Sequence, residues 1–364
     1  MTDNPLIALR ALGQSPWYDF ITRELMASGE LSRLIAEDGL MGMTSNPTIF
    51  EKAITGSSDY DDDIRRFSAA GAAPAAVFEA LAVADVQSAC DFFLPVYRDT
   101  DGNDGLVSLE VSPTLAHDPK ATIEEAARLW HLLARPNAMI KIPGTSAGLE
   151  AISECLNNGI NVNVTLLFSV KRHRAVMEAY ISALESRATR GEPIDRIASV
   201  ASFFVSRVDT RVDPMLDAAG LAELKGRTAI ANARIAYRAF LDAFSGPRWE
   251  ALQVRGARVQ RPLWASTSTK DPALPDTYYV EALVGSRTVN TLPPDTFNAY
   301  RDHGNPTCRI TDGDPSEVLK QVAAAGIDLD QVTDFLEADG VAKFAASYQS
   351  LLAGIEAKAA ALVS

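Results

Sequence analysis

The chain has 364 residues, of which 47% are hydrophobic and 22% charged, and its formal net charge at pH 7 is −13. An acidic chain lacks the excess of Lys and Arg that neutralises nucleic-acid phosphates, so we expect no nucleic-acid partner. No apolar run approaches the roughly 20 residues that cross a bilayer, and residues 1–20 do not read as a secretory signal. We therefore expect a cytoplasmic protein without a membrane partner.

Eight short apolar segments follow one another along the chain, and each is typical of a β-strand. They are residues 15–20, 39–45, 105–112, 138–144, 160–168, 197–205, 261–267 and 286–292. Amphipathic stretches lie between most of them, and the one at 118–134 opens with Asp118-Pro119, the N-cap and first-turn residues of a helix.

Three longer stretches are also rich in helix-forming residues. Residues 47–103 and 208–260 connect neighbouring strands, and residues 221–244 within the second connection indicate a nearly continuous helix. A helix-rich tail at 328–363 closes the chain, and we expect it to pack across the sheet or its mouth. We find no linker or boundary, which predicts a single domain over residues 1–364.

Repeated strand–helix units predict a parallel sheet, which is either an open doubly wound sheet or a closed (β/α)₈ TIM barrel. The dinucleotide-binding form of the open sheet carries GxGxxG after its first strand, and this chain lacks that motif. We therefore predict the barrel, with extra helices in insertions and at the C-terminus.

Polar side chains share one face of these strands. Because side chains alternate across a strand, the apolar residues of each segment take the face toward the helices and the polar ones face the barrel interior. The inward set is Asp19, Asn46, Glu110, Lys141, Asn163 and Thr165. Each lies toward the carboxyl end of its strand, where barrel active sites are built. Buried charges of both signs must interact with one another or with a substrate.

An inward lysine between two carboxylates is suited to Schiff-base chemistry. A desolvated lysine attacks a carbonyl carbon, and the resulting imine acts as an electron sink. Glu110 with Thr165 and a water could transfer the protons of imine formation, and Asp19 could accept a hydroxyl proton as a carbon–carbon bond breaks. This chemistry requires no cofactor. The three cysteines form no CxxC pair and the four histidines no HExxH motif, so we also expect no metal.

Two alternatives from other classes remain at this point. A retaining glycosidase would use Glu110 and Asp19 as acid and nucleophile, but it leaves Lys141 unexplained, and aromatic residues make up only 7% of the chain. A non-catalytic sugar-phosphate-binding barrel would not need Lys141 for its function.

Two stretches, "GMTSNPTIFEKAI" from Gly42 and "MIKIPGTSAGLEAI" from Met139, closely resemble the signatures of transaldolases. "SLEVSP", "INVNVTLLFS", "ASFFVSRVDTRVD" and "LEADGVAKF" are similar to further stretches of that family, in the same order. The resemblance runs from about Trp17 to the last helix, and the length is that of the longer bacterial subgroup.

The resemblance implies a Schiff-base Lys141 on the fourth barrel strand and transfer of a dihydroxyacetone unit from sedoheptulose 7-phosphate to glyceraldehyde 3-phosphate. It implies that Asp19 is the acid/base and that Glu110 and Thr165 hold the catalytic water. The family's substrate-binding positions are matched by Asn46, Asn163, Ser202, Arg207 and Ser266.

The phosphate site departs from the family pattern. Shorter transaldolases have Ser and Arg close together after the seventh strand, whereas this chain has Ser266 and then Lys270. Lysine offers a point charge where arginine offers a fork.

A Schiff-base aldolase that releases free dihydroxyacetone from fructose 6-phosphate would use the same residues and remains the main alternative. The expected partners are sugar phosphates, and the expected assembly is a monomer or homodimer.

Overall fold

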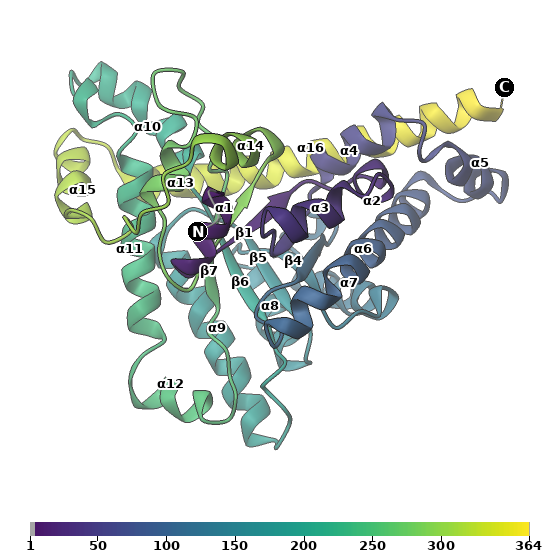
Figure 1. Cartoon of the computed structure of the whole chain (residues 1–364), viewed down its shortest axis with the longest axis horizontal. Coiled ribbons are helices and arrows are strands. Elements are labelled where there is room, and N and C mark those ends of the chain that lie inside the picture. Colours follow the sequence, from purple (N-terminus) through teal and green to yellow (C-terminus); the bar gives the residue numbers. More distant parts are fainter. Residues whose placement is uncertain (1–3, 364) are drawn as a thin grey trace.

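A closed parallel barrel of eight strands forms the centre of the computed structural model, which describes residues 4–363 (Figure 1). Each strand pairs with its neighbours in the sequence, and β1 pairs with β8 to close the barrel. The strands are β1 Gln14–Asp19, β2 Gly42–Thr44, β3 Leu106–Glu110, β4 Ala138–Pro143, β5 Val162–Leu167, β6 Ser199–Phe204, β7 Arg261–Ala265 and β8 Thr288–Leu292. All eight predicted strands and the barrel are confirmed, and the open sheet is rejected.

Helices surround this barrel. In the first half they are α1 Pro5–Ala11, α2 Arg23–Ala27, α3 Glu30–Glu37, α4 Pro47–Gly56, α5 Asp61–Ala69, α6 Pro74–Asp99, α7 Pro119–Leu133 and α8 Gly148–Asn157. In the second half they are α9 Val170–Thr189, α10 Ser206–Ala218, α11 Thr228–Ala243, α12 Gly246–Gln253, α13 Tyr278–Ala282, α14 Pro294–His303, α15 Pro315–Ala324 and α16 Leu329–Val363. Two short 3₁₀ turns, η1 Pro113–Leu115 and η2 Ala222–Leu224, complete the list.

Both long connections are helical, as predicted. The first contains α4, α5 and α6, and the second contains α10, η2, α11 and α12. The nearly continuous helix expected over 221–244 is wrong in its first part, because the chain breaks between η2 and α11. Gly226 lies there with φ +72°, a left-handed conformation that ends a helical run.

Helix α16 crosses the mouth of the barrel, which confirms the expectation for the tail. It packs against α4, α5 and α6, and it also contacts α10 and β5. Figure 1 shows α16 running beside α4 toward the C-terminal end. The carboxyl ends of the strands therefore lie beneath a helix.

Side-chain caps fix where the helices near these strand ends begin. Asn46 accepts a hydrogen bond from the backbone N–H of Ile49 at 3.0 Å, and Pro47 occupies the first turn of α4. Asp118 and Ser169 cap α7 and α9 in the same way. A cap contributes about 1 kcal/mol to helix stability. The predicted cap at Asp118 is confirmed.

Among the described residues, no helix combines the length and apolar character needed to cross a membrane. Cys90 and Cys155 are buried, Cys308 is exposed, and all three are free thiols. Burial raises the pKa of the Cys155 thiol to about 12, so it is protonated at neutral pH.

A close approach between β1 and β2 sets the spacing of the first two strands. A Cβ added to Gly42 would lie 2.5 Å from Cε2 of Trp17. Trp17 is fully buried, and its indole N–H donates to Asp104 at 3.0 Å. The indole therefore has no room to move away from residue 42.

We predict that Gly42→Ala lowers the free energy of unfolding by about 1–3 kcal/mol, because overpacking a filled core strains its neighbours. Urea denaturation measures the change. Gly56→Ala is the matched control, since a Cβ there meets nothing within 4 Å. Equal midpoints for the two variants would contradict the prediction.

Candidate active site

A cavity of about 470 Å³ opens at the carboxyl ends of the barrel strands. Most strand ends contribute polar side chains to its lining, and Phe344 reaches it from α16. The predicted residues that line it are Asp19, Asn46, Lys141, Thr165, Ser202, Arg207, Ser266 and Lys270. Glu110 and Asn163 lie directly behind this lining, as described below.

Lys141 lies on β4 and is 5% exposed. Its Nζ lies 3.2 Å from Oε2 of Glu110 and donates to the backbone carbonyl of Ser45 at 3.0 Å. Parallel register places Glu110 on β3 directly opposite Lys141. The ring of Phe344 covers the other side, with its centroid 5.6 Å from Nζ. The amine therefore lies at the boundary between the cavity and the barrel interior.

Glu110 is buried beside Lys141, and its surroundings act on it in opposite directions. Burial raises the pKa of its carboxyl group, whereas the charge and hydrogen bond of Lys141 lower it. Neither carboxylate oxygen has a well-aligned hydrogen-bond partner among residues 4–363, and the fully buried Oγ1 of Thr165 also has none there. Buried polar groups normally bond to protein or to an ordered water. These groups are therefore suited to holding a water.

A β-bulge occurs where Thr165 enters the cavity. The register between β5 and β6 shifts between Val164 and Leu167, and Leu166 has φ +57°. Bulges turn side chains out of the regular alternation and are common beside active sites. The distorted backbone therefore lies at Thr165, the residue that β5 contributes to the cavity.

Asp19 ends β1 and lines the cavity. Oγ1 of Thr44 donates to Oδ1 of Asp19 at 2.6 Å and lies 2.7 Å from Oγ1 of Thr291. Burial raises the pKa of Asp19, while the Lys141 charge, the Thr44 hydroxyl and the Arg207 charge lower it. A carboxylate with a raised pKa is a stronger base, which suits a proton acceptor.

Asn46 combines a structural and a cavity-lining position. Its side-chain oxygen caps α4, and the residue also lines the cavity. The cap uses the oxygen as an acceptor, so the amide N–H₂ retains its donors for a ligand.

Asn163 lies beneath the cavity lining and is fully buried. Its Nδ2 donates to Oγ of Ser108 at 2.9 Å, and its Oδ1 accepts from Oγ of Ser202 at 2.7 Å. Ser202 in turn lines the cavity. Asn163 therefore orients Ser202 in this structure, and its direct contact with substrate stays a prediction.

Two cations converge at one end of the cavity. Arg207 lies in the first turn of α10, stacks on Phe204 with its Cζ 5.0 Å from the ring centroid, and has a buried Nη1 with no partner among the described residues. Lys270 donates to Oγ of Ser268 at 2.7 Å. Burial lowers the pKa of both groups, and the Arg207 charge lowers the pKa of Lys270 further. Like charges with free donors are typical of an anion site.

Ser266 lies between these cations and the seventh strand. Its φ is +55°, and its Oγ lies 3.0 Å from Oγ of Ser206. The strained backbone turns the chain directly after β7, at the place where the residues depart from the pattern of shorter transaldolases.

Several cavity residues were not found from the sequence. Thr44 shares the parity of the inward set, so the alternation pattern could have found it. Thr291, Lys52 and Ser268 carried no distinguishing signal, and Phe344 reaches the site only because α16 crosses the barrel. No group of three or more His, Cys, Asp or Glu in residues 4–363 could hold a metal ion.

Comparison with known proteins identifies the family. Residues 16–355 match the family model described as Transaldolase/Fructose-6-phosphate aldolase. The chain belongs to this family. It is 51% identical to a transaldolase of Acidothermus cellulolyticus over 98% of this chain and 96% of that protein. It is 48% identical to transaldolases of Frankia alni, over 97% of this chain and 96% of that one, and of Mycobacterium tuberculosis, over 96% of each.

The family match and these relatives bear out the expected enzyme class, a transaldolase with Schiff-base chemistry on a TIM barrel. The glycosidase alternative is set aside, because it belongs to a different family and leaves Lys141 unused.

We predict that Thr44→Val moves the acidic limb of the kcat–pH profile to higher pH. The variant removes a hydroxyl that lowers the pKa of Asp19, so Asp19 would be protonated, and inactive as a base, up to a higher pH. Thr48→Val is the control: Thr48 lines the same cavity, but its hydroxyl donates to Ser347. If the acidic limb does not move in Thr44→Val, the group that titrates there is not Asp19.

Proposed function

We propose that the chain transfers a dihydroxyacetone unit from sedoheptulose 7-phosphate to glyceraldehyde 3-phosphate, giving erythrose 4-phosphate and fructose 6-phosphate, through a Schiff base on Lys141. The observation that carries the proposal is the buried Lys141 beside Glu110, at the wall of a cavity that has Asp19 on one side and two cations at its end. This is the set of groups that reversible aldol chemistry on a phosphorylated ketose requires.

Imine formation begins with attack of the Lys141 amine on the ketone carbon of the donor. The amine must first lose a proton, and Glu110 at 3.2 Å is the nearest carboxylate to receive it. The carbinolamine then loses its oxygen as water, so each imine formed releases one water and each imine hydrolysed consumes one. Glu110 and Thr165 hold that water and pass its protons.

Carbon–carbon cleavage follows on the protonated imine. Asp19 accepts the proton of the substrate hydroxyl next to the bond that breaks, and the bonding electrons move into the imine as an enamine. The aldehyde product leaves, and the three-carbon unit stays on Lys141. When the acceptor aldehyde arrives, the enamine carbon attacks it and Asp19 returns the proton.

The enamine must survive until the acceptor binds. Protonation of its carbon by water would end the cycle as free dihydroxyacetone, so the site has to limit water at that carbon. Phe344 covers Lys141 from α16. This cover favours transfer over the alternative of a Schiff-base aldolase that releases dihydroxyacetone, and an assay with and without acceptor aldehyde separates the two.

The substrate phosphate binds between Arg207 and Lys270, with the hydroxyls of Ser266 and Ser268 beside them. Donor and acceptor both carry their phosphate at the end remote from the reacting carbons, so one anion site serves both half-reactions. Asn46 and Ser202, which is oriented by Asn163, bind hydroxyl groups of the sugar. We further propose a cytoplasmic monomer or homodimer with residues 1–364 as one catalytic domain.

The decisive experiment is borohydride reduction of the protein with fructose 6-phosphate, followed by peptide mass spectrometry. We expect a reduced three-carbon adduct on the peptide that contains Lys141. Lys141→Ala should give no adduct and no turnover, with its circular dichroism spectrum unchanged. Lys52→Ala is the matched control, because Lys52 lines the same cavity and should leave the adduct in place. An adduct on another lysine, or wild-type turnover in Lys141→Ala, would refute the mechanism.

We predict that Arg207→Gln raises KM for fructose 6-phosphate by about 10- to 100-fold, since a charge-assisted hydrogen bond contributes about 1.5–3 kcal/mol. Lys270→Gln should act in the same direction but less strongly, because Lys270 is exposed. For unphosphorylated fructose, kcat/KM should change little in either variant.

The matched control is Arg211→Gln, one turn further along α10. The guanidinium of Arg211 lies over Phe335, 4.3 Å from the ring centroid, and Arg211 does not line the cavity. An equal rise of KM for fructose and fructose 6-phosphate in Arg207→Gln would show that Arg207 does not act through the phosphate.

A further inference from the structure

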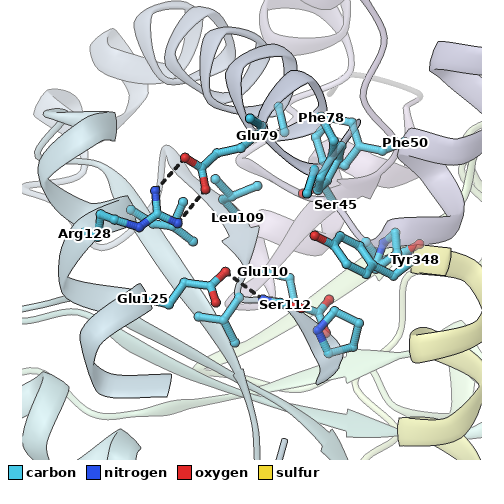
Figure 2. A pocket seen from close by; sticks show the side chains of 18 residues that line it. Ser45, Phe50, Phe78, Glu79, Leu109, Glu110, Ser112, Glu125, Arg128 and Tyr348 are labelled. Carbon is cyan, nitrogen blue, oxygen red and sulfur yellow. Dashed lines mark hydrogen bonds and ion pairs between the residues drawn. The ribbon is translucent and has the colours of Figure 1, made fainter. Parts of the chain in front are cut away.

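A second cavity, of about 350 Å³, lies beside the end of β3 (Figure 2). Residues of α4, α6, α7 and α16 enclose it, together with the end of β3. Asn46 lines both cavities, whereas Glu110 lines the second one and Lys141 the catalytic one. The ion pair between Glu110 and Lys141 therefore separates the two spaces.

The wall of this second cavity is apolar and aromatic. Phe50, Phe78 and Tyr348 form a connected row, in which neighbouring ring centroids are 5.5 Å and 5.7 Å apart in edge-to-face contact. Leu109 and Val111 extend the apolar lining. Preformed pockets of this size, with an apolar wall and a few polar groups, are characteristic of small-molecule sites.

The polar groups of the cavity are mostly acidic. The Glu110 side chain is only 4% exposed, and neither of its oxygens has a well-aligned hydrogen bond within residues 4–363. Glu125 uses one oxygen to accept from the backbone N–H of Ser112 at 3.0 Å. Arg128 is the one basic side chain among the described lining residues. Its guanidinium donates two hydrogen bonds of 2.5 Å to the carboxylate of Glu79. Figure 2 shows this pair on the other side of the pocket from Tyr348.

The charges in the lining indicate which class of ligand the cavity can bind. Three glutamates line the cavity, and Arg128, the one cation among the described lining residues, is already paired with Glu79, so an anion such as a sugar phosphate meets no free positive group there. A cationic or hydrogen-bond-donating head finds an acceptor on the second oxygen of Glu125, whereas both oxygens of Glu110 are enclosed beside Lys141. A flat apolar body fits against the row of aromatic rings.

We propose that this cavity is a second binding site, separate from the substrate site, for a small aromatic molecule that carries a cationic head group. The head lies at Glu125, and the aromatic body lies against Phe50, Phe78 and Tyr348. A ligand bound in this way presses on the end of β3, which carries Glu110, and on Asn46 without entering the substrate cavity. It therefore lowers kcat and does not simply compete with the sugar phosphate.

The test uses three isosteres of different charge on the full-length protein: benzamidine as the cation, benzamide as the neutral compound and benzoate as the anion. Benzamidine avoids the imines that a primary amine would form with aldehyde substrates. Dissociation constants are measured by ligand-observed NMR titration in the absence of substrate. We expect benzamidine to bind at least tenfold more tightly than benzoate, with benzamide between them. The absence of saturable benzamidine binding, or equal affinity for all three, overturns the proposal.

A matched pair of variants locates the site. Ala76 is an exposed residue of α6 that lines the cavity, and Ala84 is an exposed residue of the same helix that does not. Ala76→Trp should fill the mouth and weaken benzamidine binding tenfold or more, while Ala84→Trp should change it less than twofold. Equal binding by the two variants places benzamidine elsewhere and overturns the proposal.

Inhibition kinetics provide the second readout. Benzamidine should lower kcat for transfer from fructose 6-phosphate to an acceptor aldehyde, and saturating fructose 6-phosphate should not restore it. Purely competitive inhibition places benzamidine in the catalytic cavity and overturns the proposal. Because the titration needs no turnover, it reports on this second site even if the transaldolase mechanism proposed above fails.

Discussion

The ion pair between Lys141 and Glu110 is the interaction on which the rest of the site depends. Both side chains are withdrawn from water at the interface of β3 and β4, where removing a charge from solvent costs several kcal/mol. Each charge compensates the other, so loss of either partner leaves an isolated buried charge. The pair is therefore better understood as a geometric constraint on the site than as a source of stability. It keeps the amine close to a group that can accept its proton.

The barrel supplies this constraint through register. Parallel pairing places Glu110 opposite Lys141, Lys141 opposite Asn163, and Asp19 opposite Thr44. Lys141 forms an ion pair with Glu110 and Thr44 donates a hydrogen bond to Asp19, so polar groups on adjacent strands interact directly across the sheet. A shift of one residue in any of these pairings would move a functional side chain to the helix-facing side. The geometry of the site thus follows from strand pairing before any loop is considered.

The sequence predicted the elements whose signals are local. All eight strands, the cap at Asp118 and the inward position of Lys141 follow from alternation and from capping residues within a few positions. The break at Gly226 was missed because the apolar pattern continues on both sides of it, although a glycine between helical runs was a usable signal. Phe344, Thr291 and the cavity around Phe78 and Tyr348 could not be predicted, since they arise where α16 and the barrel ends meet across long stretches of chain. The family resemblance supplied residue roles, but local patterns contain no information about such distant contacts.

The pairing of β1 with β8 has a consequence for how the protein gains activity. Gln14 pairs with Thr288, so the ring of strands closes through a contact between residues far apart in the chain. Contacts between residues so far apart in the sequence form slowly, because closing the long loop costs conformational entropy before the contact stabilises the chain. Asp19 is carried by β1, and it meets the hydroxyls of Thr44 and Thr291 only when that ring is complete. Partly folded forms with an open ring would hold Lys141 and Glu110 together yet leave Asp19 without its two hydroxyl partners, so recovery of turnover during refolding should lag behind recovery of helical signal.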